Sequence, residues 1–318
     1  MDARAKGCVL VSLAAYEPAS WIDALVQNTL AFTESSTFLV MHLSNATEYG
    51  EDVMDRWNAT AGRTAINGQR LPTRSGYGSV LYAHMLNARF ATHRWAMPSS
   101  CCCSFVVLMA STMLWVRPGM EARVRTMQSS VGREGWARQG MPGASRRMWR
   151  YHQNHAKSHF GDPHERITSD FYFNLTSGGG RHAWSYHEGS FYPLGAVLRF
   201  LALLEDSLPR ADIMAATLFP EEWWLQAYVL NSMNETVRTH NTSQQLSTRY
   251  VPTSQRVPAR VVEAAARELE LECQKPSAED HSSRHRYYAH KSFAPNRSEP
   301  LTARALQLQP CQPRVEWQ

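Results

Sequence analysis

Two adjacent glutamates, Glu221 and Glu222, are the residues best suited to acid–base chemistry in this 318-residue chain. They follow Pro220 and precede Trp223, so they occupy the first turn of a predicted helix, where the helix dipole favours negative charge. The aromatic rings beside them exclude water, an environment that suits a carboxylate acting as a general base. The alternative is an ordinary helix start with favourable first-turn residues.

A second cluster, residues 187–192 (HEGSFY), combines a carboxylate with aromatic rings. Rings can stack on sugar faces, and carboxylates accept hydrogen bonds from sugar hydroxyls, so the segment favours carbohydrate binding. A plain loop that leads into a helix is the alternative.

Basic residues gather near the C-terminus at His290 and Lys291, with Arg286, Arg297 and Arg304 around them. Cationic side chains stabilise the negative charge that develops on a leaving group, so this cluster could neutralise a departing diphosphate. The alternative is a basic surface without a ligand.

A strand–helix–strand unit at the N-terminus must position these groups. The pattern predicts a buried strand over 8–16, an amphipathic helix over 18–32 and a second strand over 37–44. This order implies a parallel sheet with right-handed crossovers, in which ligands bind beyond the carboxyl ends of the strands. The loops at 14–17 and 43–45 are therefore candidate nucleotide-binding loops, with Ser12 and Ala14 at the end of the first strand.

The most apolar run, residues 101–119 (CCCSFVVLMASTMLWVRPG), predicts a further buried strand over 105–116. Its apolar part is too short for the roughly 20 residues that a membrane-spanning helix needs. The three cysteines lack the C-x₂-C spacing of a zinc site. Ser111 lies in this run and is a candidate ligand contact.

A turn at residues 76–79 (GYGS) precedes another predicted helix, near residues 80–90. A short G-x-G before a helix can cradle a phosphate, but this one lacks the full dinucleotide-binding spacing. A plain helix-entry turn is the alternative.

The length allows one large α/β domain or two smaller ones, and we expect one domain over residues 1–307. Forty-three per cent apolar residues and ten tryptophans are typical of a folded globular protein. A Gly-, Ser- and Arg-rich stretch over 120–180 predicts a loop-rich excursion, and 308–318 a disordered tail. The net charge of +5 comes without a basic block that alternates with aromatic residues, which argues against a nucleic-acid partner.

Six N-x-S/T sequons indicate life in the secretory pathway. With 11 asparagines and about 15% Ser plus Thr, chance predicts about two. We expect the Golgi lumen, with the cytoplasm as the alternative. The N-terminal apolar segment is too short and broken for a signal peptide or anchor, so we expect any membrane anchor to be missing from this chain. The sequons begin at Asn45, Asn58, Asn174, Asn234, Asn241 and Asn296.

Three segments resemble motifs of the Core-2/I-branching enzyme family, the β-1,6-N-acetylglucosaminyltransferases and the related peptide xylosyltransferases. The family's P-D-E-aromatic motif matches residues 220–223, and its G-S-aromatic segment matches 189–191. Its F-A-R-K-F element, which holds the donor diphosphate, resembles 288–293 (YAHKSF). The resemblance implies an α/β, Rossmann-like GT-A type glycosyltransferase fold, with a mainly parallel central sheet flanked by helices.

The same resemblance implies a role for each matching residue. Glu222 takes the place of the catalytic base. The acceptor-binding residues would be Glu188, Gly189, Ser190, Phe191, Glu221 and Trp223. In the matching donor element, His290 and Lys291 would bind the donor, and we also expect donor binding by Ser12, Ala14, Ser111, Arg297 and Arg304.

The implied activity is inverting, metal-independent transfer of a sugar of the GlcNAc or xylose class. The donor would be a UDP-sugar and the acceptor a hydroxyl of a glycan or glycoprotein, with no cofactor. Many glycosyltransferases with such a sheet hold a metal with a D-x-D motif after a central strand. At the corresponding position, residues 110–112, this chain has Ala-Ser-Thr. Lys291, with Arg297 or Arg304, would stabilise the departing UDP instead.

Two alternatives remain open. In the 288–293 segment His290 replaces an arginine and Ser292 is an insertion, which favours a non-catalytic carbohydrate-binding relative. The other alternative is a metal-dependent enzyme that uses His152, His155 and His159, spaced i, i+3 and i+7, although no H-E-x-x-H glutamate accompanies them.

Overall fold

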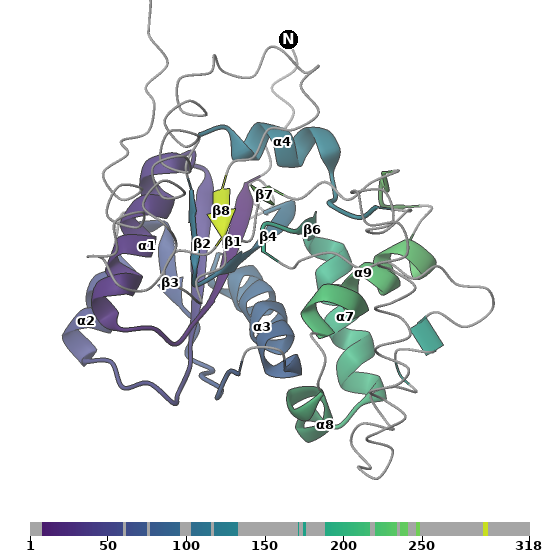
Figure 1. The fold of residues 1–318 in the computed structure, drawn as a ribbon, viewed down its shortest axis with the longest axis horizontal. Coiled ribbons are helices and arrows are strands. Elements are labelled where there is room, and N and C mark those ends of the chain that lie inside the picture. Colours follow the sequence, from purple (N-terminus) through teal and green to yellow (C-terminus); the bar gives the residue numbers. More distant parts are fainter. Residues whose placement is uncertain are drawn as a thin grey trace, which may run out of the picture.

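A five-stranded sheet forms the centre of the computed structural model (Figure 1). The structure describes residues 8–59, 62–74, 77–95, 103–115, 118–132, 171, 174–175, 188–216, 220–233, 236–240, 246–248 and 289–291. The strand order is β3-β2-β1-β4-β6, in which the first four strands are parallel and β6 is antiparallel to β4. Their bounds are β1 Val9–Ala15, β2 Thr37–Leu43, β3 Thr64–Ile66, β4 Phe105–Ala110 and β6 Phe191–Pro193.

The central strand β1 confirms the predicted N-terminal unit. All seven of its residues are buried, because β2 and β4 pair with its two edges and helices cover its two faces. Successive side chains enter opposite cores, Leu10 on one face and Val9 and Val11 on the other. A continuous apolar run is the expected sequence of such a strand. The fold class is therefore α/β, with a mostly parallel mixed sheet.

Helices lie on both faces of the sheet (Figure 1). One core includes residues of α1 and α2, and the other includes residues of α3, α7, α8 and α9. Their bounds are α1 Ala19–Phe32, α2 Glu51–Ala59, α3 Gly78–Arg94, α7 Leu194–Ser207, α8 Arg210–Ala215 and α9 Pro220–Ser232. None of the described helices is long and apolar enough to cross a bilayer.

The apolar run at 105–116 is not one strand, so that prediction was wrong in extent. β4 ends at Ala110, the chain turns at residues 111–112, and β5, Met113–Trp115, joins a second sheet of order β5-β8-β7. The other strands of that sheet are β7, Ser247–Thr248, and β8, Ala289–Lys291. Trp21 donates a hydrogen bond to the carbonyl of Ser111 (2.6 Å), which holds the turn against α1.

β5 packs beside α1 through one asparagine. The Asn28 amide donates to the carbonyl of Trp115 (2.9 Å) and accepts from its backbone N–H (2.7 Å). This reciprocal pair satisfies both the backbone N–H and the carbonyl of Trp115.

The first residues of the predicted loop-rich stretch at 120–180 form a helix, so the prediction was wrong for them. Helix α4, Met120–Met127, follows β5, and its Glu121 is fully buried. Ser129, Ser130 and Val131 are also fully buried. Of the rest of that excursion the structure describes only residues 128–132, 171 and 174–175, and the predicted tail at 308–318 lies outside the described residues.

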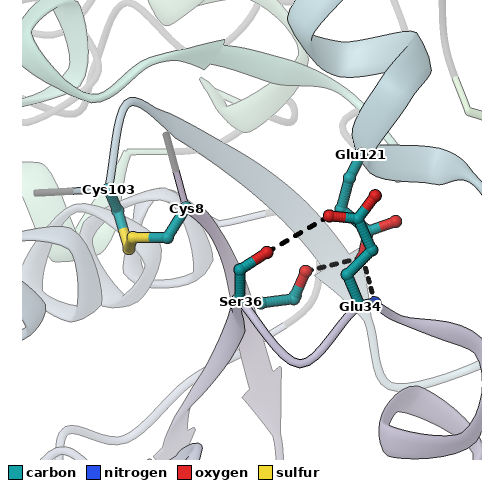
Figure 2. The surroundings of a disulfide bond; sticks show 6 residues. Cys8, Glu34, Ser36, Cys103 and Glu121 are labelled. Carbon is teal, nitrogen blue, oxygen red and sulfur yellow. Dashed lines mark hydrogen bonds between the residues drawn. A yellow bond between two sulfur atoms is a disulfide. The ribbon is translucent and has the colours of Figure 1, made fainter. Parts of the chain in front are cut away.

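A disulfide joins Cys8 and Cys103, 95 residues apart, at the amino ends of β1 and β4 (Figure 2). Near it, the buried carboxylate of Glu121 accepts hydrogen bonds from the backbone N–H of Glu34 (2.8 Å) and from the Thr37 hydroxyl (2.5 Å). The amino edge of the sheet is therefore held by a covalent bond and by a buried carboxylate.

Candidate functional site

The chain order of the sheet places a switch point between β1 and β4. After β1 the chain moves to β2 and β3 on one side, and it then returns to β4 on the other side. Ligands of open α/β sheets bind beyond the carboxyl ends of the strands at such a point, so the loops after β1 and β4 are candidate ligand loops.

Glu17 ties these two loops together. Its buried carboxylate (4% exposed) accepts a hydrogen bond from the Ser111 hydroxyl through Oε1 and from the backbone N–H of Tyr16 through Oε2 (2.9 Å). A carboxylate has about four acceptor positions, so these two bonds leave it capacity for a ligand. The 14–17 loop was a predicted ligand loop, but nothing in the sequence links Glu17 to Ser111.

Tyr16 is the exposed ring at this edge, with 47% of its surface accessible. Partial burial, and then the neighbouring Glu17 carboxylate, raise the pKa of Tyr16, so its hydroxyl stays protonated at neutral pH. Its carbonyl accepts from the Thr47 hydroxyl (2.9 Å), which fixes the backbone. An exposed ring on a fixed backbone can stack on a base or a sugar.

The loop after β2 supports this platform. Arg70 donates to the carbonyls of Leu43 (3.1 Å), Ser44 (2.8 Å) and Thr47 (2.6 Å), and its guanidinium lies 5.6 Å from the centre of the Tyr49 ring. The Tyr49 hydroxyl donates to the carbonyl of Glu17 (2.7 Å), and burial raises the pKa of Tyr49 to about 12. Because Arg70 is committed to carbonyls, it is not a free anion-binding group.

Residues 188–190 lie beside the end of β4. The Gly189 N–H donates to the Leu108 carbonyl, and the Leu108 N–H donates to the Ser190 carbonyl, both at 2.8 Å. Gly189 has φ 72°, a left-handed conformation that favours glycine. Glu188 is 2% exposed. The second predicted cluster thus reaches the same edge as Ser111.

Phe191 is a correction to the predicted acceptor site. It begins β6, pairs with Val107 and is fully buried in the core that contains α1. Its ring therefore cannot stack on a sugar.

The third predicted cluster reaches the same edge through the second sheet. β8 pairs antiparallel with β5, so the backbone of Lys291 lies opposite Met113, two residues beyond Ser111. β8, labelled near the centre of Figure 1, pairs at its other edge with β7. His290 lies opposite Leu114. Arg297 and Arg304 lie outside the described residues.

Helix α9 carries the predicted base in its first turn. Glu221 is 1% exposed and Glu222 6%, and the helix is buried on all sides from Pro220 to Leu230. Trp223, 6% exposed, lies beside them.

The segment before α9 is held at the carboxyl edge. The Gly78 N–H, which starts α3, donates to the carbonyl of Ala216 (2.7 Å). Pro220 follows four residues later, a span of at most about 14 Å for an extended chain. The first residue of α9 therefore lies within that distance of Ala216, which is held at the start of α3.

Gln226 is a polar residue that the sequence did not single out. It is 1% exposed, and neither polar atom of its amide has a hydrogen-bond partner within the described part of the chain. It lies one helical turn after Glu222, on the same face of α9. The i, i+4 spacing from the predicted base was the signal that could have found it.

Ser12 is a second correction, because it lies inside the core. It is fully buried in the middle of β1, and its hydroxyl bonds with Nδ1 of His84 (2.8 Å) and accepts from Asn87 (3.0 Å). A donor at the sheet edge would not reach it. Ala14, near the end of β1 and opposite Ala110, is 9% exposed and remains at the edge.

The turn before α3 favours the helix-entry alternative over a phosphate cradle. The Gly78 N–H is used by Ala216, and a Cβ on Gly78 would lie 1.9 Å from the carbonyl oxygen of Ile213. Glycine is therefore needed there for packing against α8.

A cavity of about 410 Å³ lies elsewhere, between α7, α9 and residues 171, 174 and 175. It contains none of the predicted site residues. Its lining is Phe171, Asn174, Leu175, Leu203, Ser207, Leu208 and Ser232.

Metal ligation gains no support from the described part of the chain, where no three His, Cys, Asp or Glu side chains are grouped to hold an ion. His152, His155 and His159 lie outside the described residues.

A comparison of the chain with models of known protein families finds no match, and a comparison with curated protein sequences finds no significant similarity.

Proposed function

We propose that the chain is an inverting, metal-independent glycosyltransferase of the Core-2/I-branching type, with a GT-A fold. It transfers a sugar of the GlcNAc or xylose class from a UDP-sugar to a hydroxyl of a glycan or glycoprotein. The observation that best supports the proposal is the meeting of three distant segments at the carboxyl end of β4: the Ser111 turn, residues 188–190 and the backbone of Lys291.

In the proposed reaction, Glu222 takes the proton from the acceptor hydroxyl. The hydroxyl oxygen attacks the anomeric carbon from the face opposite UDP, the bond from that carbon to the diphosphate oxygen breaks, and the configuration inverts. A glutamate in the first turn of a buried helix suits this role, because the helix N–H groups favour a carboxylate there and low water access favours its taking up a proton. Gln226, one turn away, offers a donor and an acceptor that no other described residue uses.

The proposed donor site has an acidic side at Glu17 and a basic side at Lys291. The Glu17 carboxylate repels a diphosphate, so the phosphates are expected toward Lys291. Lys291, supported by His290 and by Arg297 or Arg304, would stabilise the negative charge on the departing UDP. Tyr16 and Glu17 would then face the nucleoside, through stacking and through acceptance of hydroxyl hydrogen bonds.

A screen of UDP-sugars for hydrolysis or transfer, with and without a chelator, tests the proposal. Glu222→Gln should lower turnover by about 10²–10⁴-fold while UDP affinity, measured by calorimetry, is preserved. Glu221→Gln is the matched control and should retain more activity. Near wild-type turnover of Glu222→Gln would refute the assignment.

A non-catalytic carbohydrate-binding protein is the second candidate, favoured by His290 and the inserted Ser292 in the donor element. It predicts glycan binding without measurable UDP affinity. Lys291→Ala separates the two candidates, since it should weaken UDP binding in a transferase and leave glycan binding unchanged in a binding protein.

A further inference from the structure

We infer that Asn45 carries an N-linked glycan, added before its loop folds, in a compartment that also forms the Cys8–Cys103 disulfide. This inference does not depend on the proposed transferase activity. It rests on the disulfide and on the geometry of the sequon Asn45-Ala46-Thr47.

The disulfide is the first observation. Cys8 is 7% exposed, and its bond to Cys103 links two strands that are neighbours only after the sheet has assembled. Stable structural disulfides form in oxidising compartments, which in cells with a secretory pathway are also where asparagines are glycosylated. The disulfide is therefore evidence for a secretory compartment that does not depend on the number of sequons.

The position of Asn45 is the second observation. It follows β2 immediately, in a loop at the carboxyl edge, and it and Ala46 are exposed. An attached oligosaccharide would extend into solvent without displacing a core residue. The backbone N–H of Asn45 donates to the Leu71 carbonyl (3.2 Å), so this contact of the loop uses a group that glycosylation leaves unchanged.

Thr47 sets the order of events. Its hydroxyl, which a sequon requires, donates to the Tyr16 carbonyl in the folded protein (2.9 Å). Arg70 also holds the carbonyl of Thr47 (2.6 Å). In the folded loop this hydroxyl is engaged by the Tyr16 carbonyl and the backbone of Thr47 is held by Arg70, so we expect the glycan to be added before the loop docks against β1.

The modification is a group transfer from a lipid-linked oligosaccharide diphosphate. Nδ2 of Asn45 forms a bond to the anomeric carbon, the bond from that carbon to the diphosphate oxygen breaks, and the amide loses one proton. The Asn45 side-chain carbonyl is unchanged.

Asn58 provides a contrast within the chain. Its side-chain carbonyl accepts a hydrogen bond from the N–H of Ile66 (2.7 Å), so this asparagine joins α2 to β3. In unglycosylated protein, Asn58→Gln should therefore destabilise the fold, whereas Asn45→Gln should not. That difference separates an attachment site from a structural asparagine.

The decisive experiment uses the full chain isolated from its native cells. An amidase that converts glycosylated asparagine to aspartate is applied in heavy-oxygen water, and unreduced peptides are analysed by mass spectrometry. We expect the label at Asn45 and a linked pair of peptides containing Cys8 and Cys103. An unmodified Asn45 peptide as the dominant form, or free thiols at both cysteines, would overturn the inference.

A second experiment directs the full chain into the secretory pathway of cultured cells. Asn45→Gln and Thr47→Ala should each remove one glycan from the gel mobility pattern, and Thr47→Ser should keep it. The mobility is read on total cell protein, so poor secretion of a variant does not obscure the result. No change with Asn45→Gln would also overturn the inference.

Discussion

The carboxylate of Glu17 accepts a hydrogen bond from the hydroxyl of Ser111, 94 residues further along the chain. The turn that contains Ser111 has no acidic residue of its own, but the fold brings one to it from the loop after β1. A carboxylate therefore lies between the loops that follow β1 and β4, and its hydrogen bonds connect the two loops. A ligand there meets a carboxylate whose two oxygens are already oriented.

Replacing Glu17 with Gln should weaken this junction. A glutamine can accept from only one of the two donors and presents its own N–H groups to the other. We expect a loss of about 1–3 kcal/mol in the free energy of unfolding, measured with urea. Glu48→Gln, at an exposed position of the next loop, is the control and should change little. Equal stability of both variants would show that the Glu17–Ser111 pair does not hold the loops.

A pair of glycine variants tests the packing of α3 against α8. Gly78→Ala places a Cβ 1.9 Å from the carbonyl oxygen of Ile213, so α8 or α3 must move and the protein should be less stable. Gly195→Ala, in α7, meets nothing within 4 Å and should raise stability by up to about 1 kcal/mol. Thermal unfolding of the two variants measures the difference, and a neutral Gly78→Ala would contradict the close approach.

Asn28→Ala should release β5 from α1. It removes both bonds to the Trp115 backbone and leaves a buried N–H and carbonyl without partners, a loss of about 2–4 kcal/mol. Hydrogen exchange at the Trp115 amide should become faster than at the amides of β1. The control is Gln27→Ala, one residue earlier on an exposed position, which should leave that exchange rate unchanged.

His42 should make the protein less stable in mild acid. Burial lowers the pKa of His42; its hydrogen bond with Leu71 partly offsets the shift and the charge of Arg70 adds to it. The folded state therefore binds fewer protons than the unfolded chain, whose histidine titrates near about 6.5. The stability is fully present above that pH and falls as the pH decreases through it, with a slope of at most about 1.4 kcal/mol per pH unit.

Urea unfolding at pH 8 and pH 5 measures the effect of His42. The difference between the two pH values should shrink in His42→Gln and persist in the exposed control His93→Gln. An unchanged difference in His42→Gln would assign the acid sensitivity to other groups.

The disulfide should stabilise the protein without affecting the candidate site. Cys8→Ser with Cys103→Ser should lower the free energy of unfolding by about 2–5 kcal/mol, since the bond closes a loop of nearly a hundred residues. The bond lies at the amino edge and the site at the carboxyl edge, so the UDP affinity that we propose should not change. A loss of affinity at a temperature where the variant remains folded would show coupling between the edges.

The N-terminal unit could be predicted from sequence because its signals are local. The apolar run of β1 and the helical pattern of α1 each lie within one segment, and both are confirmed. The break between β4 and β5 could not be predicted, because the groups that bend the chain at Ser111 come from Glu17 and Trp21, far away in sequence.

Only some residues of the candidate site could be predicted from the sequence. The residue types at 188–190 and 290–291 indicated a ligand edge, and the structure brings their backbones to the end of β4. Phe191 and Ser12 were misassigned, since a three-residue strand and a side chain facing α3 leave no periodic signal. Burial of Glu222 depends on how α9 packs, which the sequence does not specify.

Asn87 lies at the centre of α3 and bonds to groups from three separate segments. Its amide N–H groups contact the Ser12 hydroxyl and the carbonyls of Leu13 and Val40, and its carbonyl accepts from Asn67. A slide of α3 by one helical turn, about 5.4 Å, would break all of these bonds at once, so no intermediate position along the axis is favourable. Asn87 therefore holds α3 at one position along its axis, against β1 and β2.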